Sequence, residues 1–337
     1  MYFSVFGLTL KCNRAIPGLT PLGNLPAVDV VVDLAGPLPP GYGSAESSSV
    51  LWYASPEADQ ASEPVLQVWK VRDGAYYRLR YGDGIEFVID RQGTQVWAGM
   101  PGNATLEDVA YYLLGPVFGF LLRLRGTICL HGSAVAVAGE VLALVGPAGS
   151  GKSTTAAAFA QLSYPVLTDD ITTLEENSGG FLVRPGPPRL CIWPDSVSAL
   201  YGSPEALPRL TSEDAVDPEW DKRCLDLTAP GYYFQSRPLA LRVIYLLSER
   251  DIGGPKLEAV FDGAGLMALL ANTYGSYLVE KPTRVQEFEV LSRLLGKVAV
   301  RLLTPHPDPA YIPGMCELIL QDYHALSRPA LPNEASS

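Results

Sequence analysis

The stretch VLALVGPAGSGKST, residues 141–154, decides the fold class of this chain. Its apolar part, Val141–Val145, indicates a buried strand that runs directly into a glycine-rich loop. An alanine-rich helix is predicted over Ser153–Gln161, immediately after that loop. The loop matches the pattern Gly-x-x-x-x-Gly-Lys-Ser, and a strand before it and a helix after it are the context that supports this motif. The sequence therefore predicts a phosphate-binding loop within an α/β fold.

The residues of this loop suit a bound nucleotide better than a plain glycine turn with a surface lysine. Glycines let the backbone turn so that successive N–H groups point at phosphate oxygens, and the helix N-terminus adds partial positive charge. We expect Lys152 to reach the β- and γ-phosphates and the Ser153 hydroxyl to bind Mg²⁺. ATP and Mg²⁺ are the expected cofactors, and the predicted nucleotide-binding residues are Gly146, Pro147, Ala148, Gly149, Ser150, Gly151, Lys152, Ser153 and Thr154.

Two further candidates flank the loop in sequence. Asp169 and Asp170 end the strand that follows the predicted helix. Ligands of parallel α/β sheets lie beyond the carboxyl ends of strands, so at least one carboxylate is expected near the γ-phosphate, although a turn or cap role is the alternative. His131 and Gly132 lie at a predicted break in the strand Thr127–Val137, where a lone histidine is more typical of a satisfied core residue.

The rest of the chain divides into a β-rich front and a longer second part. Residues 1–104 contain short apolar runs separated by Gly and Asp turns, which predict hairpins and a β-rich accessory region. Residues 105–326 are predicted to form the catalytic domain, beginning with a helix from Thr105 that is interrupted at Gly115-Pro116. The polar tail, residues 327–337, is predicted to be disordered.

Composition restricts the function classes. The chain has 337 residues, 47% of them hydrophobic, and a formal net charge of −11, which disfavours nucleic-acid partners. Its five cysteines are scattered without a Cys-x-x-Cys pair, as in a reduced cytoplasmic protein without structural zinc. The start of the chain does not resemble a signal peptide, and the most apolar segment, Tyr111–Leu122, is too short to span a bilayer. We therefore expect a cytoplasmic protein without a membrane partner.

Three segments together resemble the catalytic core of the HPr kinase/phosphorylase family, bacterial enzymes that phosphorylate a serine of a carrier protein. His131 lies fifteen residues before Gly146, and Asp169 lies twenty-three residues after it, as in that family. The resemblance implies an α/β fold with a P-loop core of the HPr kinase / phosphoenolpyruvate carboxykinase type. Thr154 stands where the family tends to carry Glu, and the signature of the reverse phosphorylase reaction is not evident.

The whole chain is more similar to the HPr kinase-like proteins encoded beside peptide natural-product pathways. Some of these relatives phosphorylate a lasso precursor peptide on a C-terminal serine. The resemblance implies an ATP-dependent serine kinase whose partner is a peptide or small protein with an acceptor serine. It rests on the segments Leu124-Arg125-Gly126, Leu130-His131, Asp169-Asp170, Pro188–Asp195 and Lys222-Arg223.

The resemblance also implies roles for the candidate residues. We expect Asp169 to accept the proton of the attacking serine and Asp170 to hold Mg²⁺ with Ser153, with the reverse assignment left open. His131 is expected to orient Asp169 or to touch phosphate. Arg223, beside Lys222, is a candidate nucleotide contact from a second loop, or else part of a solvated charge pair.

Other readings stay open at this point. They are a small-molecule kinase, a non-catalytic ATP-binding regulator and a phosphorylase. A peptide substrate could add as a strand to an exposed sheet edge of the front region. The bifunctional relatives are hexamers, which leaves a homo-oligomer open for this chain.

Overall fold

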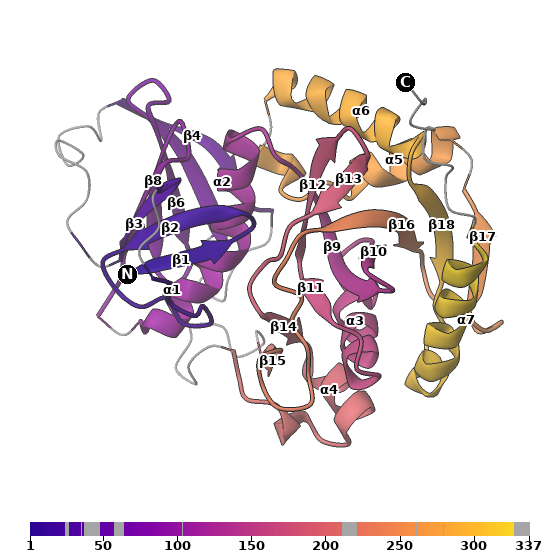
Figure 1. Ribbon diagram of the computed structural model, residues 1–337. Coiled ribbons are helices and arrows are strands. Elements are labelled where there is room, and N and C mark those ends of the chain that lie inside the picture. The colour runs from indigo at the N-terminus through magenta and orange to yellow at the C-terminus, as the bar shows by residue number, and fades with distance from the viewer. Residues whose placement is uncertain are drawn as a thin grey trace.

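The computed structural model is a mixed α/β structure with two sheets side by side, each packed against helices (Figure 1). It describes residues 1–23, 27–34, 36, 48–56, 64–102, 104–210, 221–260, 262–278 and 280–326. The predicted disordered tail, 327–337, lies outside the described residues. No helix within these ranges is long and apolar enough to cross a membrane.

The first sheet has eight strands in the order β1-β2-β3-β8-β7-β6-β5-β4. Along β3 and β8, buried residues alternate with more exposed ones, because successive side chains point to opposite faces and one face packs on the core. The Gly/Asp turns predicted from the sequence join β5 to β6 and β6 to β7. The strands are β1 (Tyr2–Val5), β2 (Leu8–Cys12), β3 (Val30–Leu34), β4 (Ser49–Ala54), β5 (Leu66–Val71), β6 (Tyr76–Tyr81), β7 (Glu86–Asp90) and β8 (Gln95–Gly99).

A helical segment covers the buried face of this sheet. It consists of α1 (Leu106–Tyr112), a π-helical turn (Leu113–Val117) and α2 (Phe118–Leu124), with the kink at the predicted Gly-Pro position. Thr105 and Asp108 form a capping box that starts α1. The buried side chains of all three parts belong to the same hydrophobic core as the first sheet. By its packing, this segment therefore belongs with the front region, whereas the sequence predicts it as the start of the domain 105–326.

The second sheet contains β9 to β13 and β16 to β18, in the order β10-β9-β12-β13-β16-β18-β17, with β11 paired to β9. β16 pairs with β13 through its first residues and then runs parallel to β10 and β18, between them. The strands are β9 (Ile128–Val137), β10 (Glu140–Val145), β11 (Val166–Thr168), β12 (Ile171–Asn177), β13 (Gly180–Val183), β16 (Leu239–Leu247), β17 (Lys256–Ala259) and β18 (Ala299–Thr304).

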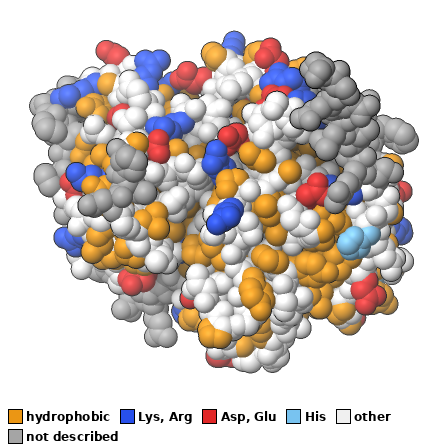
Figure 2. All heavy atoms as spheres, viewed as in Figure 1, with side chains coloured by type: hydrophobic (Ala, Val, Ile, Leu, Met, Phe, Trp, Pro, Cys, Tyr) orange, Lys and Arg blue, Asp and Glu red, His pale blue; other side chains and the backbone are white. Residues whose placement is uncertain are grey.

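Helices cover both faces of the second sheet, which explains its nearly continuous apolar strands. One face packs against α3 (Lys152–Gln161) and α7 (Ile312–Ala325), and the other against α5 (Asp262–Ala271) and α6 (Lys281–Leu295). A small sheet of β14 (Arg189–Ile192) and β15 (Arg223–Asp226) lies near α3 and α4 (Pro194–Tyr201). On the face in Figure 2, the described basic side chains are scattered and several lie beside acidic ones, so no continuous basic area is seen there.

The predicted break in strand β9 at His131 and Gly132 is wrong. β9 is continuous, with Gly132 opposite Val145 of β10 and His131 opposite Ile171 of β12. A Cβ atom on Gly132 would lie 2.8 Å from the Leu144 carbonyl oxygen. The glycine is therefore required by close contact between neighbouring strands rather than by a turn.

Candidate functional site

The glycine-rich loop follows the carboxyl end of β10, a strand paired with both β9 and β16, and leads into α3. Gly149 and Gly151 have φ angles of 75° and 103°, a left-handed backbone that favours glycine. A Cβ atom on Gly146 would lie 2.9 Å from both the Leu247 carbonyl oxygen and the Ser150 Oγ. The backbone path therefore requires glycine at all three positions.

Lys152 is the first residue of α3 and folds back into the loop. Its side chain is buried, and its Nζ donates a hydrogen bond to the Pro147 carbonyl oxygen over 2.7 Å. Burial lowers the pKa of Lys152 to about 8, while the charges of Asp170 and Asp169 oppose the shift. The ammonium group is thus held inside the loop, where an anion would be a stronger partner than a neutral carbonyl.

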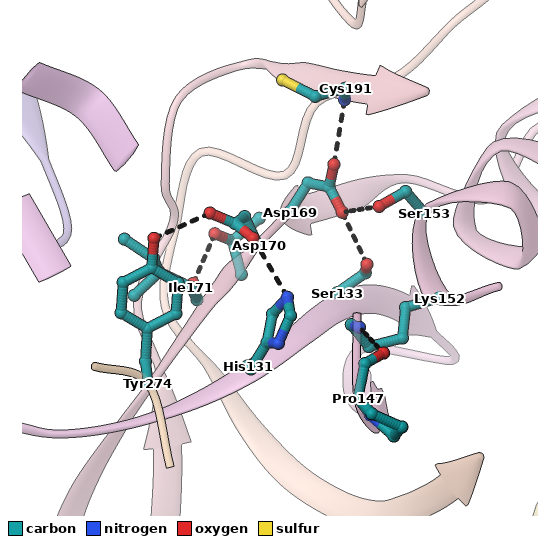
Figure 3. A network of polar contacts seen from close by, with 11 residues as sticks. His131, Ser133, Pro147, Lys152, Ser153, Asp169, Asp170, Ile171, Cys191 and Tyr274 are labelled. Atoms are coloured by element: carbon teal, nitrogen blue, oxygen red, sulfur yellow. Dashed lines mark hydrogen bonds and ion pairs between the residues drawn. The ribbon is translucent and has the colours of Figure 1, made fainter. Parts of the chain in front are cut away.

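Asp169 and Asp170 lie at a strained turn between β11 and β12, both of which pair with β9. The Ile171 N–H donates to the Asp169 carbonyl oxygen over 2.8 Å, and Asp170 has a φ of 68°. This is a γ-turn with positive φ, which is rare and strained for any residue other than glycine. The turn directs two consecutive carboxylates into different surroundings (Figure 3).

The Asp169 carboxylate is buried and faces the loop. Its Oδ1 accepts hydrogen bonds from the Ser133 Oγ at 2.6 Å and the Ser153 Oγ at 2.9 Å. Its Oδ2 accepts a hydrogen bond from the Cys191 backbone N–H at 2.9 Å. Three donors therefore fix this carboxylate beside the serine of the loop.

The Asp170 carboxylate faces a cavity, and its side chain is 38% exposed. Its Oδ1 lies 3.2 Å from the His131 Nε2, and its Oδ2 accepts a hydrogen bond from the Tyr274 hydroxyl at 3.0 Å. Burial by the surrounding protein raises the pKa of Asp170. The opposing effects of His131, Lys222 and the Tyr274 hydroxyl are larger together, so the pKa lies below its usual range. Burial keeps the pKa of Tyr274 well above its ordinary value, so its hydroxyl is a hydrogen-bond donor at neutral pH.

The central cavity has a volume of about 900 Å³, which is within the range of small-ligand sites. The residues that line this cavity come from the loops and helices around both large sheets. From the loop these are Pro147, Ala148, Gly149, Gly151, Lys152, Ser153 and Thr154, and from other segments they include Tyr111, Pro116, His131, Asp170, Trp193 and Tyr274–Tyr277. A side cavity of about 310 Å³ adjoins it and shares Gly151, Thr154 and Arg250.

The structure brings most of the predicted site residues together. Gly146 and Ser150 are buried residues of the loop itself. They support its backbone but do not line the central cavity. Arg223 is not brought into the site: its guanidinium group donates to Asp221 and to the Leu207 carbonyl oxygen. Its neighbour Lys222 lines the cavity instead, because successive residues of an extended segment point to opposite sides.

Three further residues of the site were not predicted from the sequence. Ser133 lies on β9 and reaches Asp169, and Arg250 donates from its Nη2 to the Gly149 carbonyl oxygen over 3.2 Å. Tyr274 follows α5 and is held at β9 by a 2.8 Å hydrogen bond from its N–H to the Cys129 carbonyl oxygen. Ser133 directly follows the His131-Gly132 pair, whereas Arg250 and Tyr274 come from segments without a motif, so only the tertiary fold identifies them.

The donor set suits a hard cation only in part. Among the described residues, no group of three or more His, Cys, Asp and Glu side chains could hold a metal ion. The Ser153 hydroxyl and Asp169 carboxylate provide oxygen ligands of the kind that Mg²⁺ prefers, usually together with phosphate oxygens and water. The residues present therefore fit Mg²⁺ that arrives with a phosphate ligand.

No protein-family model and no curated protein matches this chain. Among solved structures, it is similar to the structure of the Hpr(Ser) kinase/phosphatase from Coxiella burnetii, with 13% sequence identity and a TM-score of 0.27. The match covers 58% of this chain and 94% of that chain. A likeness at this level leaves the function to be argued from the site itself.

Proposed function

We propose that this protein is a phosphotransferase that moves the γ-phosphate of ATP to a hydroxyl group. The observation that carries the proposal is the hydrogen bond between Ser153 of the loop and Asp169, beside the inward-facing Lys152. It joins a glycine loop, a buried ammonium group and a carboxylate at one point. Catalysis of phosphoryl transfer consists mostly of positioning and charge neutralisation, and these groups supply both.

On the phosphate side, the backbone N–H groups of the loop and Lys152 would bind the triphosphate. Ser153 and Asp169 would hold Mg²⁺, which when bound neutralises charge on the phosphate oxygens. Asp169 is suited to this role because its carboxylate is fixed by three donors and already contacts the loop serine. The Lys152 ammonium group would exchange the Pro147 carbonyl oxygen for a phosphate oxygen.

On the opposite side, Asp170 would accept the proton of the attacking hydroxyl. Its carboxylate opens to the central cavity, and His131 and Tyr274 fix its orientation. A carboxylate with a low pKa is a weak base, but a loose transition state requires little activation of the nucleophile. These roles of Asp169 and Asp170 are the reverse of those expected from the sequence, and the different surroundings of the two carboxylates support the reversal.

The motif spacing supports a finer proposal, in which the core is of the HPr kinase type and the acceptor is a serine of a peptide or small protein. A lasso precursor peptide with a C-terminal serine is the acceptor that the resemblance favours. A small hydroxyl compound is the second candidate, because the central cavity is lined by aromatic side chains such as Tyr111 and Trp193.

The test is transfer of label from γ-labelled ATP with Mg²⁺ to a precursor peptide encoded beside the gene. Label on a peptide serine is expected with the wild-type chain and not with Lys152→Ala or Asp170→Asn. Lys11→Ala is the matched control, because Lys11 is an exposed lysine on β2, far from the loop in sequence. Tight ATP binding without transfer to any peptide or small hydroxyl compound would instead indicate a regulatory nucleotide-binding protein.

A further inference from the structure

Helix α2 packs in the core of the first sheet, yet it also contacts the site directly. A Cβ atom on Gly119 of α2 would lie 2.2 Å from Cε1 and 2.5 Å from Cδ1 of the Tyr274 ring. Real Cβ contacts are essentially never this short, so the ring occupies the space that any other residue would fill. The absence of a side chain at Gly119 is therefore what allows Tyr274 to take its position.

One turn further along α2, Arg123 holds the backbone of the same tyrosine. Its Nη1 donates a hydrogen bond to the Tyr274 carbonyl oxygen over 2.5 Å. Its Nη2 forms an ion pair with Glu287 of α6, and the two side chains are only 3% and 5% exposed. A buried pair of this kind fixes geometry strongly, because neither charge can move back to water without loss of its partner.

The second sheet holds Tyr274 from the other side. Its N–H donates to the Cys129 carbonyl oxygen, and the N–H of His131 donates to the Asn272 carbonyl oxygen, each over 2.8 Å. The Tyr274 ring also meets the His131 ring edge to face, with centroids 5.9 Å apart. With the backbone held from both sides, the ring position determines where the hydroxyl meets Asp170.

We infer that α2 is a positioning element of the active site, in which Gly119 and Arg123 seat Tyr274 and Tyr274 orients Asp170 and His131. The inference rests on the proposed function for the role of Asp170, but the seating itself is independent of that role. It makes the region around the first sheet a part of the catalytic apparatus rather than a separate accessory. A methyl group at position 119 would displace the ring and loosen the Asp170 contact.

Histidine side-chain NMR tests the seating without any assay of activity. The chain has three histidines, His131, His306 and His324, so their ring signals are few enough to assign by single substitutions. Gly119→Ala is expected to shift the His131 signal and to leave the other two in place. Gly314→Ala on α7 is the matched control, because a Cβ atom there meets nothing within 4 Å. An unchanged His131 signal in Gly119→Ala would overturn the inference.

A second-site variant separates the local effect from general damage to the fold. Tyr274→Ala removes the ring, so it makes room for a methyl group on α2. Adding Gly119→Ala to Tyr274→Ala should then cause no further shift of the His131 signal and no further loss of thermal stability. Equal effects of Gly119→Ala in both backgrounds would show that the methyl group acts elsewhere, and would overturn the inference.

Kinetics test whether the seating serves catalysis. Gly119→Ala is expected to lower the rate of ATP turnover about 10- to 100-fold, as a small misplacement of a reacting group does, with ATP affinity within about twofold of wild type. A shifted His131 signal with unchanged turnover would overturn the catalytic part of the inference. If the wild-type chain turns over no ATP, the proposed function fails, while the NMR result still decides the seating.

Discussion

The two sides of the central cavity are built in different ways. The proposed phosphate side is mainly one contiguous segment, residues 146–153, whose glycines, lysine and serine act within a few residues of one another, with Asp169 added from the β11–β12 turn. The opposite side is assembled from β9, the β11–β12 turn, the segment after α5 and the helices of the first sheet. The first side depends on local backbone geometry, and the second depends on how distant parts of the chain pack.

The largest expected effect is a loss of stability on the side of the cavity that is assembled from distant parts of the chain. Glu287→Ala leaves the Arg123 guanidinium buried without its ionic partner, which should cost about 3–5 kcal/mol of stability. Urea unfolding measures this loss. The paired replacement of Arg123 by Met and Glu287 by Leu is the control, because it removes both charges and should cost much less. A loss below about 1 kcal/mol in the single variant would show that the pair does not hold the two parts together.

The next largest effect is a loss of phosphoryl transfer that is confined to the phosphate side of the cavity. Lys152→Ala removes the ammonium group of the loop and should lower phosphoryl transfer about 10²- to 10³-fold, the typical effect of losing one charge-stabilising donor. The His131 ring signal should stay where it is, because Lys152 does not contact the Tyr274 seating. Transfer rates and histidine NMR spectra measure the two sides separately. Wild-type rates in this variant would contradict the role of the loop.

A smaller effect is expected where strands β9 and β10 meet, between the two sides of the cavity. Gly132→Ala places a Cβ atom 2.8 Å from the Leu144 carbonyl oxygen, so the two strands must move apart. The expected cost is about 1–3 kcal/mol, as for other overpacked sites. Thermal unfolding against the Gly314→Ala control measures it. A stability equal to that of wild type would mean that β9 and β10 do not lie as close together as the 2.8 Å contact requires.

The smallest effect is a pH dependence confined to the phosphate side. Burial lowers the pKa of Lys152 to about 8, so the free protein loses this charge as the pH rises above 8. A phosphate ligand binds the protonated lysine, so affinity should fall with rising pH, by about fivefold between pH 8 and pH 9 for a single group of this pKa. Calorimetry with ADP in the absence of Mg²⁺ measures it. Lys152→Arg keeps its charge throughout and should bind equally at both pH values, whereas a flat wild-type profile would contradict the assignment.

The same contrast explains what the sequence could predict. Strand β10 and helix α3, on either side of the glycine-rich loop, were predicted correctly, because the apolar run, the glycine pattern and the helix-forming residues all lie within residues 141–161. The γ-turn at Asp170 had no such signal, since it depends on the pairing of β11 and β12 with one strand. Tyr274 is 104 residues from its partner Asp170, so no local pattern could place it.

Two of the helices were not predicted from the sequence. Helices α4 and α7 both carry proline in the first turn, where its missing N–H costs nothing, but in the sequence these prolines resemble helix breakers. The helices before β9 pack their buried face against the first sheet, a contact between segments that no local pattern in the sequence predicts.

In the proposed mechanism Asp169 binds the metal and Asp170 accepts the proton of the acceptor, and ATP binding titrated with and without Mg²⁺ distinguishes these two roles. Asp169→Asn should lose most of the Mg²⁺-dependent part of ATP affinity, about 10- to 100-fold, because its carboxylate contacts the loop serine. Asp170→Asn should keep that affinity within about twofold, because its contacts are with His131 and Tyr274. Loss of the Mg²⁺ dependence in Asp170→Asn, with Asp169→Asn unaffected, would contradict the account and restore the assignment expected from the sequence.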